Sequence, residues 1–362
     1  MKRIPTTHLI PGMTVAQNVL NLNRQLIIAK GTVLTDRLIL KLDSYGILAV
    51  YIEDTPAAKP PEQLVPVPEK PSPYSERVKN SPVFKQFKQD YEHNIDSFRD
   101  AINNVVEKNI QLDVKKLLSD SLQAINNSKG QLGVMDMLHN MREYDDSTFA
   151  HCMNVGLICN VFAKWLKMSD DEIELATACG LLHDIGKLLV PRSIVTKPGK
   201  LTDEEYATIQ KHPVRGYEML RAQHVDPHIC NAALLHHERS DGSGYPTRMR
   251  GEQIDIYARI VAIADVYDAM TAARVYRGPL CPFRVIEMFE AEGFQRYDVQ
   301  YLLVFLENVV NTYVQNSCRL SDGTEGEIIY INHDKFSRPI VKCGPKYINL
   351  MEHPDLCIMD LI

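Results

Sequence analysis

The chain has 362 residues, of which 45% are hydrophobic and 24% are charged. These values are typical of folded globular proteins and exclude wholesale disorder, and the length is ample for two domains. The formal net charge of −6 gives no general attraction to DNA or to anionic lipid. No run of 18 or more uncharged apolar residues occurs and no apolar segment follows Met1–Pro5, so we expect neither a membrane span nor a secretion signal.

The eight cysteines are scattered along the chain without any C-x-x-C pair. Several of them interrupt apolar helical patterns, where a cysteine behaves as a small buried hydrophobic residue. We therefore predict free thiols and a cytoplasmic location, because a reducing compartment keeps thiols unpaired.

Residues 1–55 are predicted to form a small β-rich N-terminal domain, because short apolar runs alternate there with turn signals. The runs at 25–28 and 47–52 indicate strands, and the segment near 35–44 indicates one helix. Residues 56–74 are rich in Pro, Glu, Lys and Ala, which predicts an extended linker.

From residue 75 onward the apolar side chains follow a helical spacing, as in Phe84, Phe87, Tyr91 and Ile95. We predict a helical connecting region over 75–140 and a helical domain over 141–316, with helices near 154–167, 173–182, 204–210, 229–236 and 254–273. Strand-like alternation returns after residue 323, so residues 317–362 are predicted to form a small β-rich C-terminal segment. The expected fold class is therefore mainly α, with β-rich ends.

Seven side chains of metal-binding type lie in or beside the predicted helices: His151, His183, Asp184, His212, His236, His237 and Asp265. An ionised carboxylate on an apolar helix is costly unless it is paired or bound to a metal. Imidazoles and carboxylates together suit divalent ions such as Fe, Mn, Zn, Co or Ni. Two such ions sharing a carboxylate would activate a water for attack on phosphorus, so we predict hydrolysis of a phosphodiester.

Each of these residues also has an ordinary structural interpretation. A single histidine such as His212 could simply be hydrogen-bonded, and the pair His236–His237 could cap a helix through its terminal carbonyls. Asp265 alone could form a buried salt bridge. Their joint occurrence on consecutive helical segments favours the metal site.

Two motifs carry a specific resemblance to a known family: His183-Asp184-Ile185-Gly186-Lys187 and Asp241-Gly242-Ser243-Gly244-Tyr245-Pro246. With further matches at 147–151, 211–216, 264–271 and 274–277, the chain resembles the HD-GYP family, a subgroup of the HD-domain metal-dependent phosphohydrolases. The resemblance covers roughly residues 140–315 and implies an HD-type helical bundle, so that residues 141–316 form an HD-GYP catalytic domain. Residues 9–13 and 31–34 more weakly resemble a short N-terminal domain of unknown function (DUF3391-like).

The resemblance also implies roles for individual residues. Asp184 would bridge two metal ions, and Asp184 and Lys187 would act directly in catalysis. One ion would be completed by His151, His183 and Asp265, and the other by His212, His236 and His237. The residues implied to contact substrate are Lys187, Tyr245, Asp268, Arg274 and Arg277.

The number and identity of the ions follow from the same resemblance. Some relatives hold a third metal through a glutamate at the position of Ser147, so we favour two ions here. Fe or Mn is the preferred identity, with Ni, Co or Zn as alternatives, because the same ligands suit several ions.

The Gly-Tyr-Pro loop has two interpretations of equal weight. The turn dipeptides Asp241-Gly242 and Ser243-Gly244 predict a tight loop after the helix that carries His236 and His237. Tyr245 could form a wall of the substrate site, or the loop could be a docking surface for a diguanylate cyclase or another signalling protein. Alternatively, the loop only buttresses the two histidines.

The resemblance implies hydrolysis of cyclic di-GMP to pGpG or GMP, which would lower the level of a bacterial second messenger. Another cyclic dinucleotide, such as 3′,3′-cGAMP, stays open as the substrate. A catalytically weak regulator that binds the nucleotide is a further alternative, but all seven ligands are present, which favours the enzyme. A homodimer is left open, and DNA is not an expected partner.

Overall fold

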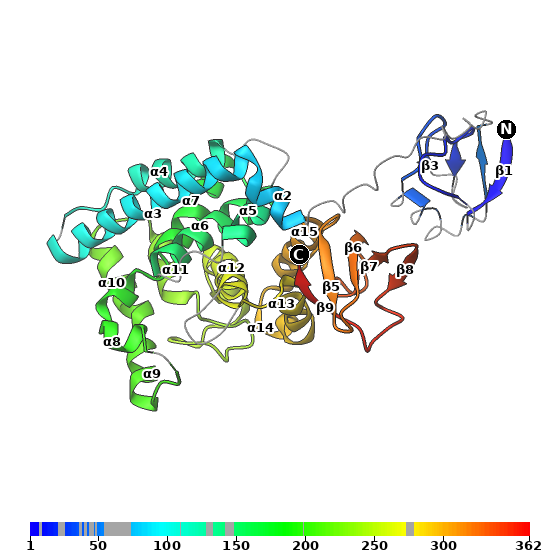
Figure 1. Cartoon of the computed structure of the whole chain (residues 1–362). Helices are drawn as coiled ribbons and strands as arrows, with labels where there is room; N and C mark the ends of the chain where they lie inside the picture. The colour runs from blue at the N-terminus through cyan, green and yellow to red at the C-terminus, as the bar shows by residue number, and fades with distance from the viewer. Residues whose placement is uncertain are drawn as a thin grey trace.

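The computed structural model describes residues 1–6, 9–20, 26–35, 38–39, 42, 47, 49–53, 74–108, 110–127, 133–141, 148–197, 199–272 and 279–362. Most of the predicted helix at 35–44, nearly all of the predicted linker at 56–74, and the residues Ser147, Arg274 and Arg277 lie outside these ranges. The expected fold class is confirmed, because helices make up the body of the chain and strands occur near its two ends (Figure 1).

The N-terminal residues form two small antiparallel sheets around a core of their own. Strand β1 (Lys2–Pro5) pairs with β4 (Ala49–Ile52), and β2 (Val19–Leu20) pairs with β3 (Leu26–Ile28). The buried residues of this core are Leu9, Val15, Val19, Ile28, Leu34, Leu42, Val50 and Ile52. The strands predicted at 25–28 and 47–52 therefore correspond to β3 and β4, whereas the pairing of Lys2–Pro5 was not predicted.

The first helices of the body pack against its core. They are α2 (Tyr74–Asn80), α3 (Pro82–Lys108), α4 (Val114–Asn127) and α5 (Val134–Met141). The predicted spacing on α3 is confirmed, since Phe84, Phe87, Tyr91 and Ile95 are all buried. Most of the remaining positions of α3 are polar, so this helix lies on the surface of the bundle.

The central helices are largely apolar and bury most of their residues in the interior of the bundle. They are α6 (Thr148–Trp165), α7 (Asp170–Leu182), α11 (Pro227–Leu235) and α12 (Ile256–Thr271). α6 and α7 pack closely because glycines lie at their contact: a Cβ on Gly180 would be 2.8 Å from the Cα of Gly156. Ser169 and Glu172 form a capping box that begins α7.

Further helical elements lie around these four helices (Figure 1). They are η2 (Ile185–Leu189), α8 (Arg192–Val195), α9 (Asp203–Ile209), α10 (His212–Ala222), η3 (Gly251–Gln253), α13 (Pro282–Met288), η4 (Phe289–Gly293), α14 (Phe294–Arg296) and α15 (Val299–Asn311). No helix in the described ranges is long and apolar enough to cross a bilayer.

The C-terminal residues form one antiparallel sheet in the order β8-β7-β6-β5-β9. The strands are β5 (Ser317–Leu320), β6 (Glu325–Tyr330), β7 (Ile340–Cys343), β8 (Lys346–Asn349) and β9 (Ile358–Leu361). Apolar side chains of this sheet, such as Ile328 and Val341, join the core of the helical body. Arg338 also donates to Glu287 on α13 at 3.0 Å, so the sheet is fixed to the helices.

Candidate metal centre

The seven predicted ligands lie at the ends or in the middle of apolar helices that meet in the interior. His151 lies on α6, His212 begins α10, and Asp265 lies in the middle of α12. The remaining four follow the last turns of α7 and α11: His183, Asp184, His236 and His237. Six of the seven are less than 9% exposed, and the His237 side chain is 17% exposed.

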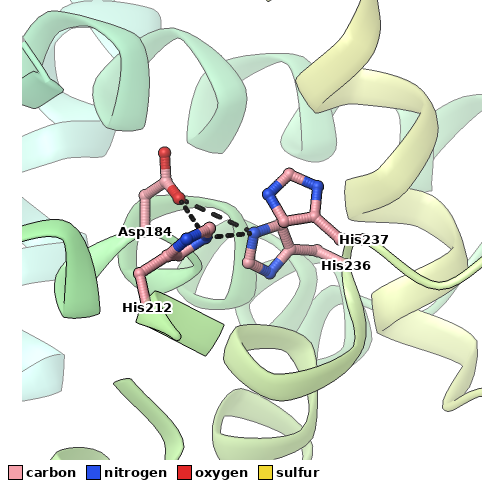
Figure 2. A group of neighbouring side chains, drawn as sticks. All are labelled: Asp184, His212, His236 and His237. Carbon is pink, nitrogen blue, oxygen red and sulfur yellow. Dashed lines mark hydrogen bonds and ion pairs between the residues drawn. The ribbon is translucent and has the colours of Figure 1, made fainter. Parts of the chain in front are cut away.

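The structure brings these seven side chains together in two groups. Asp184, His212, His236 and His237 form one group, and His151, His183 and Asp265 form the other. Within each group, one ligand atom from every residue lies within 4.8 Å of the others. Figure 2 shows the first group, in which the Asp184 carboxylate and the imidazoles of His212 and His236 point toward one another.

The Asp184 carboxylate lies between the two groups and presents one oxygen to each. Its Oδ1 is 3.1 Å from Nε2 of His212 and 3.6 Å from Nε2 of His236. Its Oδ2 is 3.4 Å from Nε2 of His183 and 3.7 Å from Nε2 of His151. This arrangement suits a carboxylate that bridges two cations.

Backbone carbonyls fix the orientation of three of the imidazoles. The Nδ1 atom of His183 is 2.7 Å from the Gly180 carbonyl oxygen, and that of His236 is 3.0 Å from the Ala232 oxygen. His212 makes the same contact with the Ile209 oxygen at 2.8 Å. A carbonyl only accepts, so each Nδ1 carries the proton and each Nε2 presents a lone pair to the cluster.

These lone pairs have no adequate partner among the side chains themselves. Nε2 of His183 and Oδ1 of Asp184 are buried without a hydrogen bond, and Nε2 of His212 is only 3.2 Å from Nε2 of His236. Buried acceptors that face one another are unfavourable unless a cation lies between them. The residues present therefore fit a pair of divalent metal ions.

Charge favours the same conclusion. Burial opposes ionisation of Asp184, but the charge of Lys187 holds its pKa well below the usual value. Burial lowers the pKa of His236 to about 4, even though Asp184 opposes the shift. Burial also holds the pKa of His237 well below its ordinary range. At neutral pH the carboxylate is ionised and these imidazoles are neutral, which is the form that binds metal.

Comparison with known proteins identifies the domain that holds this cluster. A family model described as "HD domain" matches residues 114–301, which is more than half of the chain. The chain belongs to the HD-domain family. The predicted resemblance is thereby confirmed for this domain, whereas the resemblance of the N-terminal residues stays a prediction.

Curated relatives of the HD domain include phosphodiesterases for two cyclic dinucleotides. A cyclic di-GMP phosphodiesterase of Pseudomonas aeruginosa is 36% identical over 203 residues, which are 56% of this chain and 49% of the relative. A 3′3′-cGAMP-specific phosphodiesterase of Vibrio cholerae is 40% identical over 167 residues, which are 46% of this chain and 39% of the relative. The chain thus spans about half or less of the length of these relatives.

A solved structure agrees with the fold of the HD domain and its surroundings. A protein from Bdellovibrio bacteriovorus described as an HDG"Y"P protein superposes with a TM-score of 0.51 at 16% sequence identity. The match covers 85% of this chain and 99% of the other chain. The similarity extends beyond the segment matched by the family model and concerns the fold alone.

Two further predicted residues lie against the metal ligands of the HD domain. Lys187 donates from its Nζ to Oδ2 of Asp184, and its side chain is 25% exposed. Asp268 is 1% exposed, and its Oδ2 is 2.8 Å from Nδ1 of His151. Asp268 therefore orients the His151 imidazole, and its contact with substrate stays a prediction.

Asp268 and Asp265 also determine the charge of His151 in the metal-free chain. Burial alone would disfavour its protonation, but hydrogen bonds with both carboxylates raise its pKa to about 9. Nε2 of His151 lies 3.0 Å from Oδ1 of Asp265, where a metal ion would replace the proton. This imidazole thus differs from His236, which is neutral.

The Gly-Tyr-Pro loop of the HD domain lies directly on one of the histidines. The Tyr245 ring stacks on the His237 imidazole, with centroids 4.7 Å apart and an angle of 29° between the planes. Burial raises the pKa of the Tyr245 hydroxyl. The stacking supports the interpretation in which the loop buttresses the two histidines. The roles of the loop in substrate binding and in partner docking stay predictions.

Sequence reasoning missed one residue of this region, Glu238. It follows His237, is 2% exposed and accepts three hydrogen bonds from the far end of the loop. A single glutamate after a helix carries no signal that distinguishes it from a solvated residue. The role of Asp268, by contrast, could have been found from its position three residues after Asp265, on the same helix face.

Proposed function

We propose that the HD domain hydrolyses cyclic di-GMP to pGpG or GMP with a pair of divalent metal ions. The observation that carries this proposal is the Asp184 carboxylate, which faces a separate histidine group with each of its oxygens. When bound, two ions in this arrangement supply an activated water and neutralise charge on the phosphoryl oxygens. Fe or Mn is our preferred identity, with Ni, Co or Zn as alternatives.

The remaining residues of the site act on the substrate in this proposal. Lys187 reaches the centre from a partly exposed position, so its ammonium is available to a phosphate oxygen once metals neutralise Asp184. Tyr245 forms a wall beside His237. Arg274 and Arg277 lie outside the described residues, and their contact with phosphate stays a prediction from the sequence.

The identity of the cyclic dinucleotide is supported by similarity and not by geometry. Relatives of comparable identity are described as phosphodiesterases for cyclic di-GMP and for 3′3′-cGAMP. We therefore keep 3′,3′-cGAMP as the second candidate substrate. A catalytically weak regulator is less well supported, because all seven ligands are present and meet in two groups.

The test is turnover of both dinucleotides in parallel, with protein purified without oxygen and supplied with Mn or Fe(II). We expect pGpG or GMP from cyclic di-GMP, and loss of both metal and turnover in Asp184→Ala. Asp170→Ala is the matched control, because Asp170 is exposed at the start of α7 and distant from the ligands in sequence. No turnover of either dinucleotide by any metal form of the folded protein would refute the proposal.

We also propose that the protein acts in the cytoplasm. All eight cysteines are unpaired, and six of them are buried, which suits a reducing compartment. A diguanylate cyclase or another signalling protein at the Gly-Tyr-Pro loop, and a homodimer, stay predictions. Co-purification with wild-type and loop-altered protein, together with light scattering, would test these two associations.

A further inference from the structure

The buried carboxyl group of Glu238 contacts the far end of the Gly-Tyr-Pro loop and belongs to neither group of metal ligands. Its Oε1 accepts hydrogen bonds from the backbone N–H of Thr247 at 2.6 Å and of Arg248 at 3.0 Å. The Thr247 hydroxyl donates to the same oxygen at 2.7 Å. Glu238 is only 2% exposed and belongs to neither ligand group, so its contacts serve the loop.

The loop between Glu238 and Thr247 folds back tightly on the end of α11. A Cβ on Gly244 would lie 2.5 Å from the Glu238 Cα and from the His237 carbonyl oxygen, so only glycine fits there. The Tyr245 N–H donates to that same carbonyl at 3.3 Å. Glu238 thus holds the far end of a loop whose middle already touches the backbone of His237.

The fold of this loop determines where the Tyr245 ring lies. Tyr245 is two residues before Thr247, and its ring stacks on the His237 imidazole at a centroid distance of 4.7 Å. His237 is the most exposed of the seven ligands, and carbonyl contacts to Nδ1 orient three of the others. The aromatic ring therefore supplies a restraint on His237.

We propose that Glu238 is a positioning residue that acts on the metal centre through Tyr245. Its carboxyl oxygen fixes Thr247 and Arg248, these fix the loop, and the loop holds the Tyr245 ring against His237. Glu238 needs only an acceptor at Oε1 for this role, because Oε2 is buried without a hydrogen-bond partner. The inference rests on the proposed function for its metal centre, but its structural readout, hydrogen exchange, needs neither metal nor substrate.

The first test separates the hydrogen-bonding role from a role of the charge. Glu238→Gln keeps an acceptor at the same reach, Glu238→Asp is one methylene too short, and Glu238→Ala has no acceptor. Glu252→Gln is the matched control, since Glu252 is exposed on the nearby element η3. Hydrogen exchange is measured by mass spectrometry on peptides that contain Thr247 and Arg248, in metal-free and in metal-loaded protein.

We expect exchange of these two amides to accelerate about 3- to 10-fold in the Asp and Ala variants, as for the loss of an ordinary hydrogen bond. The Gln variant and the Glu252 control should exchange as the wild type does. Unchanged exchange in the Ala variant would overturn the proposal that Glu238 fixes Thr247 and Arg248. A Gln variant that matches the Ala variant would show that the charge itself acts, and would also overturn it.

The second test asks whether Glu238 acts through Tyr245. We expect metal affinity to fall about 10- to 100-fold in Glu238→Ala and to stay near wild type in Glu238→Gln. Tyr245→Ala should weaken metal binding similarly, and the double variant should be little worse than either single one. If the losses of metal affinity in the two single variants were fully additive in the double variant, Glu238 would not act through Tyr245. Failure of the proposed activity would leave the exchange and metal-binding results intact, so the two proposals fail separately.

Discussion

Replacement of Gly186 by alanine should disrupt the metal centre although Gly186 binds nothing itself. A Cβ at this position would lie 2.0 Å from the carbonyl oxygen of His212 and 2.6 Å from the backbone N of Gly216. An ordinary carbon–oxygen contact is about 3.3 Å, so η2 and α10 must separate by about 1.3 Å. Both neighbours are backbone atoms, which cannot rotate out of the way.

The displacement acts on two ligands of one group, because Asp184 precedes η2 and His212 begins α10. Ligand distances in metal sites vary by only about 0.2 Å. A shift of this size should therefore remove the ion that Asp184 and His212 bind together. Overpacking also lowers the free energy of unfolding by about 1–3 kcal/mol. Metal content, turnover and thermal unfolding of Gly186→Ala measure these effects.

Gly216→Ala is a matched control at the same contact between η2 and α10. A Cβ on Gly216 would meet its nearest atom, the Gly186 N, at 3.2 Å, so a shift of a few tenths of an ångström suffices. Alanine also favours the helical conformation of α10. We expect this variant to keep its metal and turnover. A Gly186→Ala protein with wild-type metal content would refute the reasoning.

Three further predictions concern charge and protonation. Asp268→Asn removes the carboxylate at Nδ1 of His151 and should weaken metal binding about 10- to 100-fold in a titration; unchanged affinity would contradict this. Because the pKa of His151 is about 9 and that of His236 about 4, metal binding at pH 7 should release about one proton, and affinity should rise with pH up to about 9. Calorimetry in buffers of different ionisation enthalpy counts that proton, and no release would contradict the assignment. Lys187→Met should keep its metal but lose turnover about a hundredfold, and a variant as active as wild type would exclude the phosphate contact.

The helices that build the site were predictable because their apolar periodicity is strong. The predicted segments at 154–167, 173–182 and 229–236 correspond to α6, α7 and α11, with boundaries displaced by a few residues. The seven ligand candidates were also identifiable, since polar metal-binding residues on apolar helices are costly without a partner. Their division into two groups was implied by family resemblance and not by spacing.

The contacts that orient the ligands could not be predicted from the sequence. The carbonyl oxygens that fix the imidazoles belong to Gly180, Ile209 and Ala232, and any residue type offers the same carbonyl. Glu238 resembles a solvated glutamate until the loop folds back on it. Such features depend on the tertiary arrangement of the backbone, which the pattern of side chains along the sequence does not predict.

The central claim is that Asp184 is shared by two metal ions. Anomalous diffraction from crystals of the metal-loaded protein, recorded at the absorption edge of the metal, tests it most directly. We predict two peaks, one beside His212, His236 and His237 and one beside His151, His183 and Asp265, with one Asp184 oxygen directed at each. A single peak, or two peaks of which one lies away from Asp184, would contradict the claim.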